Sequence, residues 1–326
     1  ADWPDLRAAL DAALPRHGLR PVPHGQVEAW MRDRRVRDAS LATHEELADL
    51  AGSTGAELIL SGDLYTCAAQ APFAAGFSGR LLDPSRPEIL AMAMVALEGE
   101  TLRGPLGSGP AITRERTLRE AARRFAELLA PGPEGARRAG LRRFKASVLA
   151  PEPAGWTAAS LRGRAPARIV VMPFRQQTRR AGAGQAMADA VTWRLVASGR
   201  VGVVSPAGPV RRLLERGWRT GLPVGADELR ALRDLTGVDG VLMGTVERWE
   251  DGDPSGARPP VVALSARLLD TATGAILWAA WHERRGDQTR IVYEQGNERT
   301  AEGLALRAAA ELLDPLIDSF NEVPRP

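Results

Sequence analysis

The second half of the chain alternates short apolar runs with amphipathic stretches. The stretch 168–174, which is apolar after Arg168, predicts a buried strand, and apolar residues that recur at helical spacing predict a helix over about 184–198. Gly237 is suited to end a later helix, because glycine adopts the left-handed conformation found after helix C-termini. The other elements predicted here are a strand near 201–204, helices after Pro206 and from about 226, strands near 239–249, 260–270 and 275–284, and a helix over about 300–320.

The order of these elements indicates a mixed sheet. The early strand–helix–strand order favours parallel pairing through a right-handed crossover. Later, the stretch from Asp270 to Gly274 favours a tight hairpin, since Asp supplies a side-chain hydrogen bond and Gly a positive φ. The predicted class is therefore α/β, with a mixed parallel and antiparallel sheet covered by helices in a three-layer-like domain.

Much of this pattern occurs twice. A helix-to-strand junction framed by Gly55 and Gly62 in the first half has a counterpart framed by Gly237 and Gly244 at the same offset. The matching segments are 46–62 with 228–244, 80–90 with 267–277, and 125–129 with 309–313. Three matches in one order predict two tandem, divergent copies of one domain, since the period is too long for a solenoid.

The repeat sets the expected domain boundaries. The first copy spans 1–130, a Pro-, Gly- and Arg-rich linker spans 131–167, and the second copy spans 168–326. The first copy starts with a helix and has no strand before it. Either its first strand lies upstream of this sequence, or the segment 146–150 takes its place.

Composition and charge narrow the class of protein. The 326 residues are 44% hydrophobic and 25% charged, which is typical of a globular protein, and no run is long enough to predict a membrane-spanning helix. The 43 basic and 40 acidic residues nearly balance, and the pI near 9.7 reflects that Lys145 is the only lysine. The start at Ala1 suggests a processed or trimmed chain, with any export signal or lipid anchor upstream.

Residues for catalysis or metal binding are sparse. Cys67 is the only cysteine, so the chain can form no intrachain disulfide. The pairs His44-Glu45 and His282-Glu283 lack a second histidine at helical spacing, so the metalloprotease motif is broken. Nucleophile-elbow and phosphate-loop patterns are absent from the sequence. We therefore expect no enzyme, and no catalytic, metal-binding or cofactor-binding residues.

Five residues are candidates for partner binding. Trp278 and Trp281 have opposite parity on one strand, so one faces the helices and the other the outer side of the sheet. An exposed tryptophan there would be a candidate for an interface, with packing in the core or at an edge as the alternative. Trp249, on a neighbouring strand, is the third candidate. Arg179 and Arg180 precede a Gly-rich helix start and are either solvated charge or part of an anion or partner site.

A family resemblance emerges at the hairpin. The segment 268–278 resembles the superfamily that includes the curli-secretion lipoprotein, the lipoprotein activators of penicillin-binding proteins and the amino-terminal domain of TolB. The strand at 170–174 and the junction at 237–244 are similar to that family too. The resemblance covers 168–320, and reaches 5–130 only through the internal repeat. It implies exported or lipid-anchored envelope proteins that act by binding, without a shared catalytic residue.

We therefore expect a non-enzymatic scaffold or assembly and secretion accessory protein, periplasmic or associated with the outer membrane. The expected partners are envelope or secretion-apparatus proteins, including peptidoglycan-synthesis machinery, and further copies of the chain. The alternative is a nucleic-acid or anion-binding module, for which the densest basic cluster, 137–145, would be the candidate surface.

Overall fold

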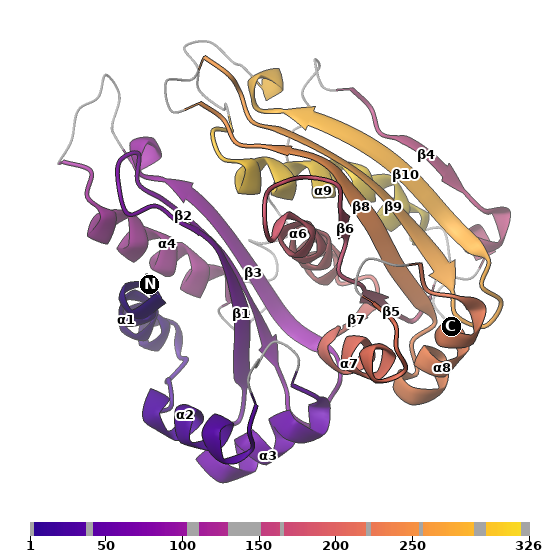
Figure 1. Ribbon diagram of the computed structural model, residues 1–326, viewed down its shortest axis with the longest axis horizontal. Coiled ribbons are helices and arrows are strands. Elements are labelled where there is room, and N and C mark those ends of the chain that lie inside the picture. Colours follow the sequence, from indigo (N-terminus) through magenta and orange to yellow (C-terminus); the bar gives the residue numbers. More distant parts are fainter. Residues whose placement is uncertain are drawn as a thin grey trace.

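A computed structural model describes residues 3–36, 42–102, 111–129, 151–163, 166–219, 223–253, 257–289 and 298–320. The molecule is built in layers, which Figure 1 shows from left to right: helices, a first sheet, further helices and a second sheet. The first half of the chain forms the first two layers. The second half forms the other two.

The first half contains a three-stranded sheet and the helices that flank it. Its sheet has the order β1-β2-β3 and is antiparallel throughout. The elements are α1 (Trp3–Ala13), η1 (Leu14–His17), α2 (His24–Asp33), α3 (His44–Thr54), β1 (Ile59–Cys67), β2 (Ala74–Leu82), β3 (Ile89–Glu98), η3 (Gly99–Leu102) and α4 (Arg114–Leu129).

The second half contains a larger, mixed sheet. Its main order is β4-β10-β9-β8-β5-β7, with the short β6 also paired to β8. The elements are β4 (Ala154–Thr157), η5 (Ala159–Gly163), β5 (Arg168–Val171), β6 (Arg175–Gln176), α6 (Ala183–Ser198), β7 (Gly202–Val204), α7 (Ala207–Glu215), α8 (Ala226–Thr236), β8 (Gly240–Glu250), β9 (Val261–Asp270), β10 (Ile276–Arg285), η6 (Gly286–Thr289) and α9 (Ala301–Ser319).

The α/β class expected from the sequence is confirmed, and the second sheet is mixed as predicted. Strand β5 pairs in parallel with β7 and β8, while β8, β9 and β10 pair antiparallel. The described part of the first sheet differs, because it is only antiparallel. The reason is topological: parallel strands need a crossover between them, and the first half places α1, α2 and α3 before its first described strand.

Two three-stranded units share the same strand pairing. We call β1, β2 and β3 the first unit, and β8, β9 and β10 the second unit. Both units have a β-bulge at the same place between the first two strands, and another at the same place between the last two. The matching pairs run from Ile59 opposite Leu82 to Leu64 opposite Phe77, and from Val241 opposite Leu269 to Val246 opposite Leu264.

Corresponding glycines allow the first two strands of each unit to approach closely. A Cβ on Gly62 would collide with the backbone oxygen of Ser78, and one on Gly244 with that of Ser265. Only glycine therefore allows the two strands to approach this closely. The junction glycines noted in the sequence, Gly55 and Gly237, both end a helix with positive φ.

Hydrophobic cores on both faces of the first unit join the layers. Helices α1 and α4 pack on one face of the first unit, which forms a core of its own. The opposite face, which we call the outer face of the first unit, packs on α6 and α9 of the second half. One hydrophobic core therefore joins residues of both halves, among them Met94 of β3 and Trp193 of α6.

A backbone contact also ties the halves together. Glu88, just before β3, forms an antiparallel bridge with Val204 of β7, and the Ser205 N–H donates to the Pro87 carbonyl at 3.0 Å. The first half thus extends the second sheet beyond β7.

Part of the expected linker, 131–167, is ordered. Ala154–Thr157 forms β4, an edge strand paired antiparallel with β10. The segment 146–150, considered as a substitute first strand, and the basic cluster 137–145 lie outside the described residues. Within the described ranges, no helix combines the length and hydrophobicity needed to cross a membrane.

Candidate binding surfaces

A buried carboxylate lies where the first sheet meets α6. Asp189 is only 2% exposed, and its carboxylate accepts hydrogen bonds from the hydroxyls of Tyr65 and Ser78. It also accepts from Arg80 at 3.0 Å and Gln185 at 3.1 Å. Burial and the nearby carboxylates raise the pKa of Tyr65 well above its ordinary value. The phenol is therefore protonated and donates to Asp189, and these hydrogen bonds join the first sheet to α6.

A second polar contact between the halves involves one of the predicted arginines. Arg180 donates to the Thr66 hydroxyl at 2.8 Å and lies 3.5 Å from a carboxylate oxygen of Glu302. Thr66 also donates to Glu302. The neighbouring Arg179 is exposed. Arg180 therefore joins the first sheet to α9, and the structure does not bring the two arginines together in one site.

Two of the three predicted tryptophans lie in the core. Trp278 is 2% exposed on the face of β10 that packs on α9, and Trp249 is buried as well. Trp281 has the opposite orientation, as its parity predicts, and is 42% exposed. The three tryptophans therefore do not form one surface.

Trp281 belongs to the outer face of the second unit, the face that is turned away from α9. Trp156 of β4 lies on the same face and is 56% exposed. The register places the two rings diagonally across neighbouring strands, because Trp281 is opposite Ala154 and Trp156 opposite Ala279. Ile276, also exposed, extends this apolar stripe along β10.

Helices cover only one end of this face. Helices α7 and α8 pack over the end next to β5 and β7, where they bury Met243 and Leu269. The end that carries Trp156 and Trp281 has no helix packed on it in the described part of the chain, as Figure 1 shows on the side of β4 and β10. We call this end the open face. Sequence reasoning missed Trp156, because Pro and Gly around it favoured a linker.

Polar groups surround the tryptophans of the open face. The Trp281 indole N–H donates to Glu247 at 2.8 Å, and this is the one contact that the structure gives the Glu247 side chain among the described residues. Arg248 lies 2.9 Å from Glu250 and 3.1 Å from Glu283, at the far end of β8. The open face therefore combines exposed tryptophans with Ser265 and Arg267 of the middle strand and with further charges of both signs.

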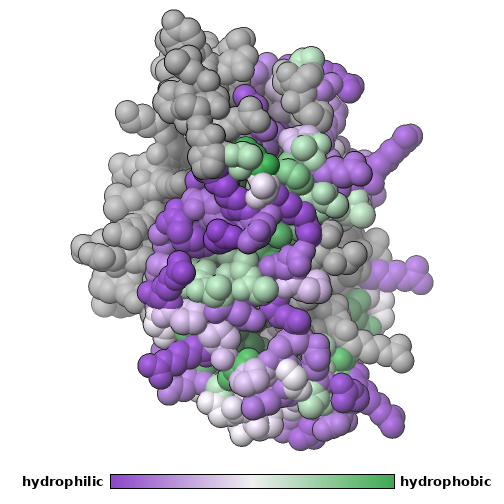
Figure 2. Space-filling view, turned by 90° about the vertical axis from the view of Figure 1, so that its left-hand side faces the viewer, coloured by the Kyte–Doolittle hydropathy of each residue, from purple (hydrophilic) through white to green (hydrophobic). Residues whose placement is uncertain are grey.

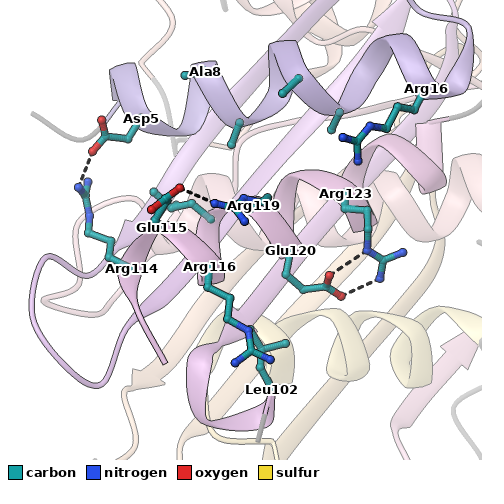
Figure 3. A pocket seen from close by; sticks show the side chains of 14 residues that line it. Asp5, Ala8, Arg16, Leu102, Arg114, Glu115, Arg116, Arg119, Glu120 and Arg123 are labelled. Atoms are coloured by element: carbon teal, nitrogen blue, oxygen red, sulfur yellow. Dashed lines mark hydrogen bonds and ion pairs between the residues drawn. The ribbon is translucent and has the colours of Figure 1, made fainter. Parts of the chain in front are cut away.

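A groove lies on the opposite side of the molecule, between α1 and α4 (Figure 3). Its volume is about 950 Å³. Alanines of α1 form one wall, and arginines and carboxylates of α4 form the other. Figure 2 faces this side and shows pale green, mildly apolar side chains between purple, hydrophilic ones. The alanines are Ala8, Ala9, Ala12 and Ala13.

Most charges of this groove are paired with each other. Arg114 pairs with Asp5 at 2.5 Å, and Arg123 with Glu120 at 2.7 Å. The hydrogen bonds from Arg123 lower the pKa of Glu120 to about 2, so that this carboxylate stays ionised. Arg16, at the end of the groove, has no acidic partner among the described residues.

A third charged cluster is structural. His282 and Arg284 lie on the buried side of β10, where His282 Nε2 is 2.8 Å and Arg284 Nε 3.5 Å from Glu311 of α9. Burial lowers the pKa of Arg284. This cluster attaches α9 to β10. Across the described ranges, no group of three or more His, Cys, Asp or Glu is placed to hold a metal ion.

Comparisons with known proteins give likenesses of structure. No family model matches the sequence, and no curated protein matches it significantly. The PelC dodecamer structure from Paraburkholderia phytofirmans is 22% identical over 50% of this chain and 95% of PelC, with a TM-score of 0.35. Lipoprotein GNA1162 from Neisseria meningitidis is 26% identical over 37% of this chain and 81% of that protein, with a TM-score of 0.28.

The LpoB C-terminal domain from Escherichia coli is 16% identical over 37% of this chain and 85% of that domain, with a TM-score of 0.27. All three TM-scores are below 0.5.

Proposed function

We propose that this chain is a non-enzymatic scaffold of the bacterial cell envelope that binds a protein partner through the open face. The observation that carries the proposal is the pair Trp156 and Trp281, whose side chains are 56% and 42% exposed next to each other on a sheet face without a covering helix in the described chain. Tryptophan is among the residues that contribute most to protein interfaces.

The composition of the open face supports a protein partner over a nucleic acid. Exposed aromatic residues and arginine, surrounded by polar groups, are enriched in protein–protein interfaces. A polynucleotide surface needs a continuous run of cations, and this face carries Glu247 and Glu283 beside Arg248. The alternative of a nucleic-acid module is therefore disfavoured at this site.

The envelope location rests on the resemblance of the hairpin at 268–278 and of the junction at 237–244. In that superfamily the proteins are exported or lipid-anchored and act by binding. We propose the same setting here, periplasmic or at the outer membrane, with the chain composed of two tandem copies of the domain. The matched strand registers of the two units support the tandem copies.

Site-specific crosslinking in the native cells tests this proposal. A photo-crosslinking residue replaces Trp156, and a control replaces the highly exposed Asp227 of α8, the helix that packs over the other end of this sheet face. We expect adducts with defined proteins of the envelope fraction from position 156 alone, and their loss when Trp281→Ala is added. Equal adducts from both positions, adducts with RNA, or recovery in the cytoplasm would each contradict the proposal.

A further inference from the structure

The chain contains two surfaces that fit each other. Building on the proposed function, we infer that the partner at the open face is a second copy of this chain, which receives the face in its groove between α1 and α4. The contact would repeat between molecules the packing that the first unit makes on α6 and α9 within one molecule.

The internal contact provides the template. The outer face of the first unit lies on α6 and α9, and there Asp189, Ser78 and Met94 are almost completely buried. Helix α6 is buried on nearly all sides, because it has its own sheet on one side and the first sheet on the other. A sheet face on a pair of helices is thus a packing mode that this sequence already uses.

The open face corresponds to the face that is buried in this template. The shared registers place Trp281 of the second unit at the position of Met94, because each is opposite the matching serine on the middle strand, Ser265 or Ser78. Met94 is 3% exposed and Trp281 42%. The second unit therefore presents, without a partner in the described chain, the surface that the first unit buries.

The groove corresponds to the helical surface that receives this face. Helix α4 packs on β2 and β3 as α9 packs on β9 and β10, and α1 packs against α4 as α6 packs against α9. Gly18 and Gly199 have positive φ after these helical segments, and aligning them places Ala8 where Asp189 lies. One turn on, Ala12 takes the place of Trp193. Ala8 and Ala12 are exposed, while their counterparts on α6 are buried.

Side-chain sizes on the two surfaces are complementary. Within the molecule, the helix supplies the large Trp193 and the sheet supplies Met94. Between molecules, the helix would supply Ala12 and the sheet Trp281. The large side chain thus lies on the helix in the internal contact and on the sheet in the contact between molecules. Because the helix wall of the groove is made of small alanines, the groove has a volume of about 950 Å³. A tryptophan from another copy fills such a space better than a methionine would.

The charges are complementary as well. Five arginines and three carboxylates line the groove, so that it carries a net positive charge. On the open face, Glu247 contacts only the Trp281 indole, and in the groove Arg16 lacks an acidic partner, both within the described residues. Arginine also packs favourably on the face of an exposed tryptophan ring.

This contact is heterologous, because it joins two different surfaces of identical chains. Each molecule then has one free open face and one free groove, and assembly continues until a ring closes or as an open chain. A face-to-face dimer of the two tryptophan stripes would instead leave the groove unused. Variants of the groove therefore distinguish the two arrangements.

Mixing of variants tests the inference on the full chain. Trp281→Ala removes the face, Ala12→Trp fills the groove, and sedimentation velocity measures the size distribution over a range of concentrations. We expect the unmodified chain to form species larger than dimers. Each variant alone should associate about 30-fold more weakly, the loss expected for a central tryptophan. An equimolar mixture should form dimers and nothing larger, because one intact face meets one intact groove.

Three outcomes would overturn the inference. Self-association of Ala12→Trp like that of the unmodified chain would indicate a face-to-face contact. Failure of the mixture to form dimers would exclude the pairing of face with groove. A monomeric unmodified chain, together with envelope adducts from position 156, would show that the proposed function holds and that its partner is another protein. Ala8→Glu is a second groove variant should Ala12→Trp fail to fold by circular dichroism.

Discussion

The two three-stranded units have the same registers and the same bulges, yet the outer face of one is buried and that of the other is exposed. In the first unit this face is buried against α6 and joined to it through Asp189, Tyr65 and Ser78. In the second unit the corresponding face is open and presents Trp281 beside Trp156. Identical strand geometry therefore does not decide whether a face is core or surface. The side chains on it, and what lies opposite, decide that.

The comparison also shows how polar residues are used. Ser78 and Arg80 of the first unit correspond to Ser265 and Arg267 of the second, by register. The first pair is buried because Asp189 offers a carboxylate to both, whereas the second pair is partly exposed. A single acidic residue on the facing helix thus makes a polar sheet face compatible with burial.

The largest effect is expected from removing that acid. Asp189→Ala leaves the buried Arg80 with Asp63 as its one carboxylate partner among the described residues, and it removes the carboxylate that accepts from the hydroxyls of Tyr65 and Ser78. Breaking a buried ion pair in this way costs about 3–5 kcal/mol. Urea unfolding of the full chain should show the loss. Asp318→Ala, at an exposed position of α9, is the control, with an effect within about 0.5 kcal/mol. A comparable loss in both variants would refute the distinction.

A matched pair of truncations should separate the two faces. Met94→Ala creates a cavity between the first sheet and α6 and should destabilise the chain by about 2–5 kcal/mol. Trp281→Ala, at the corresponding position of the second unit, should cost less than about 1 kcal/mol in the free chain, since the ring is substantially exposed. Thermal and urea unfolding at low protein concentration measure both. If Trp281→Ala proves the more destabilising change, the open face is part of the core.

The smallest effect concerns pH and the contact between α3 and α7. Burial raises the pKa of Glu46. Hydrogen bonds from the Thr43 N–H and Arg211, together with the charge of Arg211, lower it by more, so that the pKa of Glu46 lies below its ordinary value of 4.5. A carboxylate whose pKa is lowered in the folded state stabilises the fold at pH values above its ordinary pKa. This stabilisation is lost as the pH falls through the lowered pKa. Glu46→Gln should therefore flatten the loss of stability between about pH 5 and pH 3, by less than about 1 kcal/mol. Identical pH profiles for the variant and the unmodified chain would contradict this.

The sequence predicted the second half well, because its signals are local. Apolar runs and helical spacing placed α6, α8, β8, β9 and β10 close to their observed bounds, and Gly237 ends α8 with positive φ. Strand β4 was missed, since four residues between prolines and glycines carry no periodicity of their own. It forms because β10 offers an edge, which is a property of the folded sheet.

The candidate site was only partly predictable. Parity identified Trp281 as a residue on the opposite face from Trp278, and the structure agrees. The partners that Asp189 and Arg180 have on the first sheet, among them Tyr65 and Thr66, lie more than 100 residues away in sequence, in the other half of the chain. No local pattern could assign them, because the contact depends on how the halves stack.

The bridge between Glu88 and Val204 has a consequence for solubility. It covers the β7 end of the second sheet with chain from the first half. At the other end lies β4, only four residues long and preceded by Pro151 and Pro153, which cannot donate backbone hydrogen bonds. Both edges of the second sheet are therefore poor templates for an added strand. This disfavours amyloid-like aggregation at high protein concentration, and it leaves the open face free to bind.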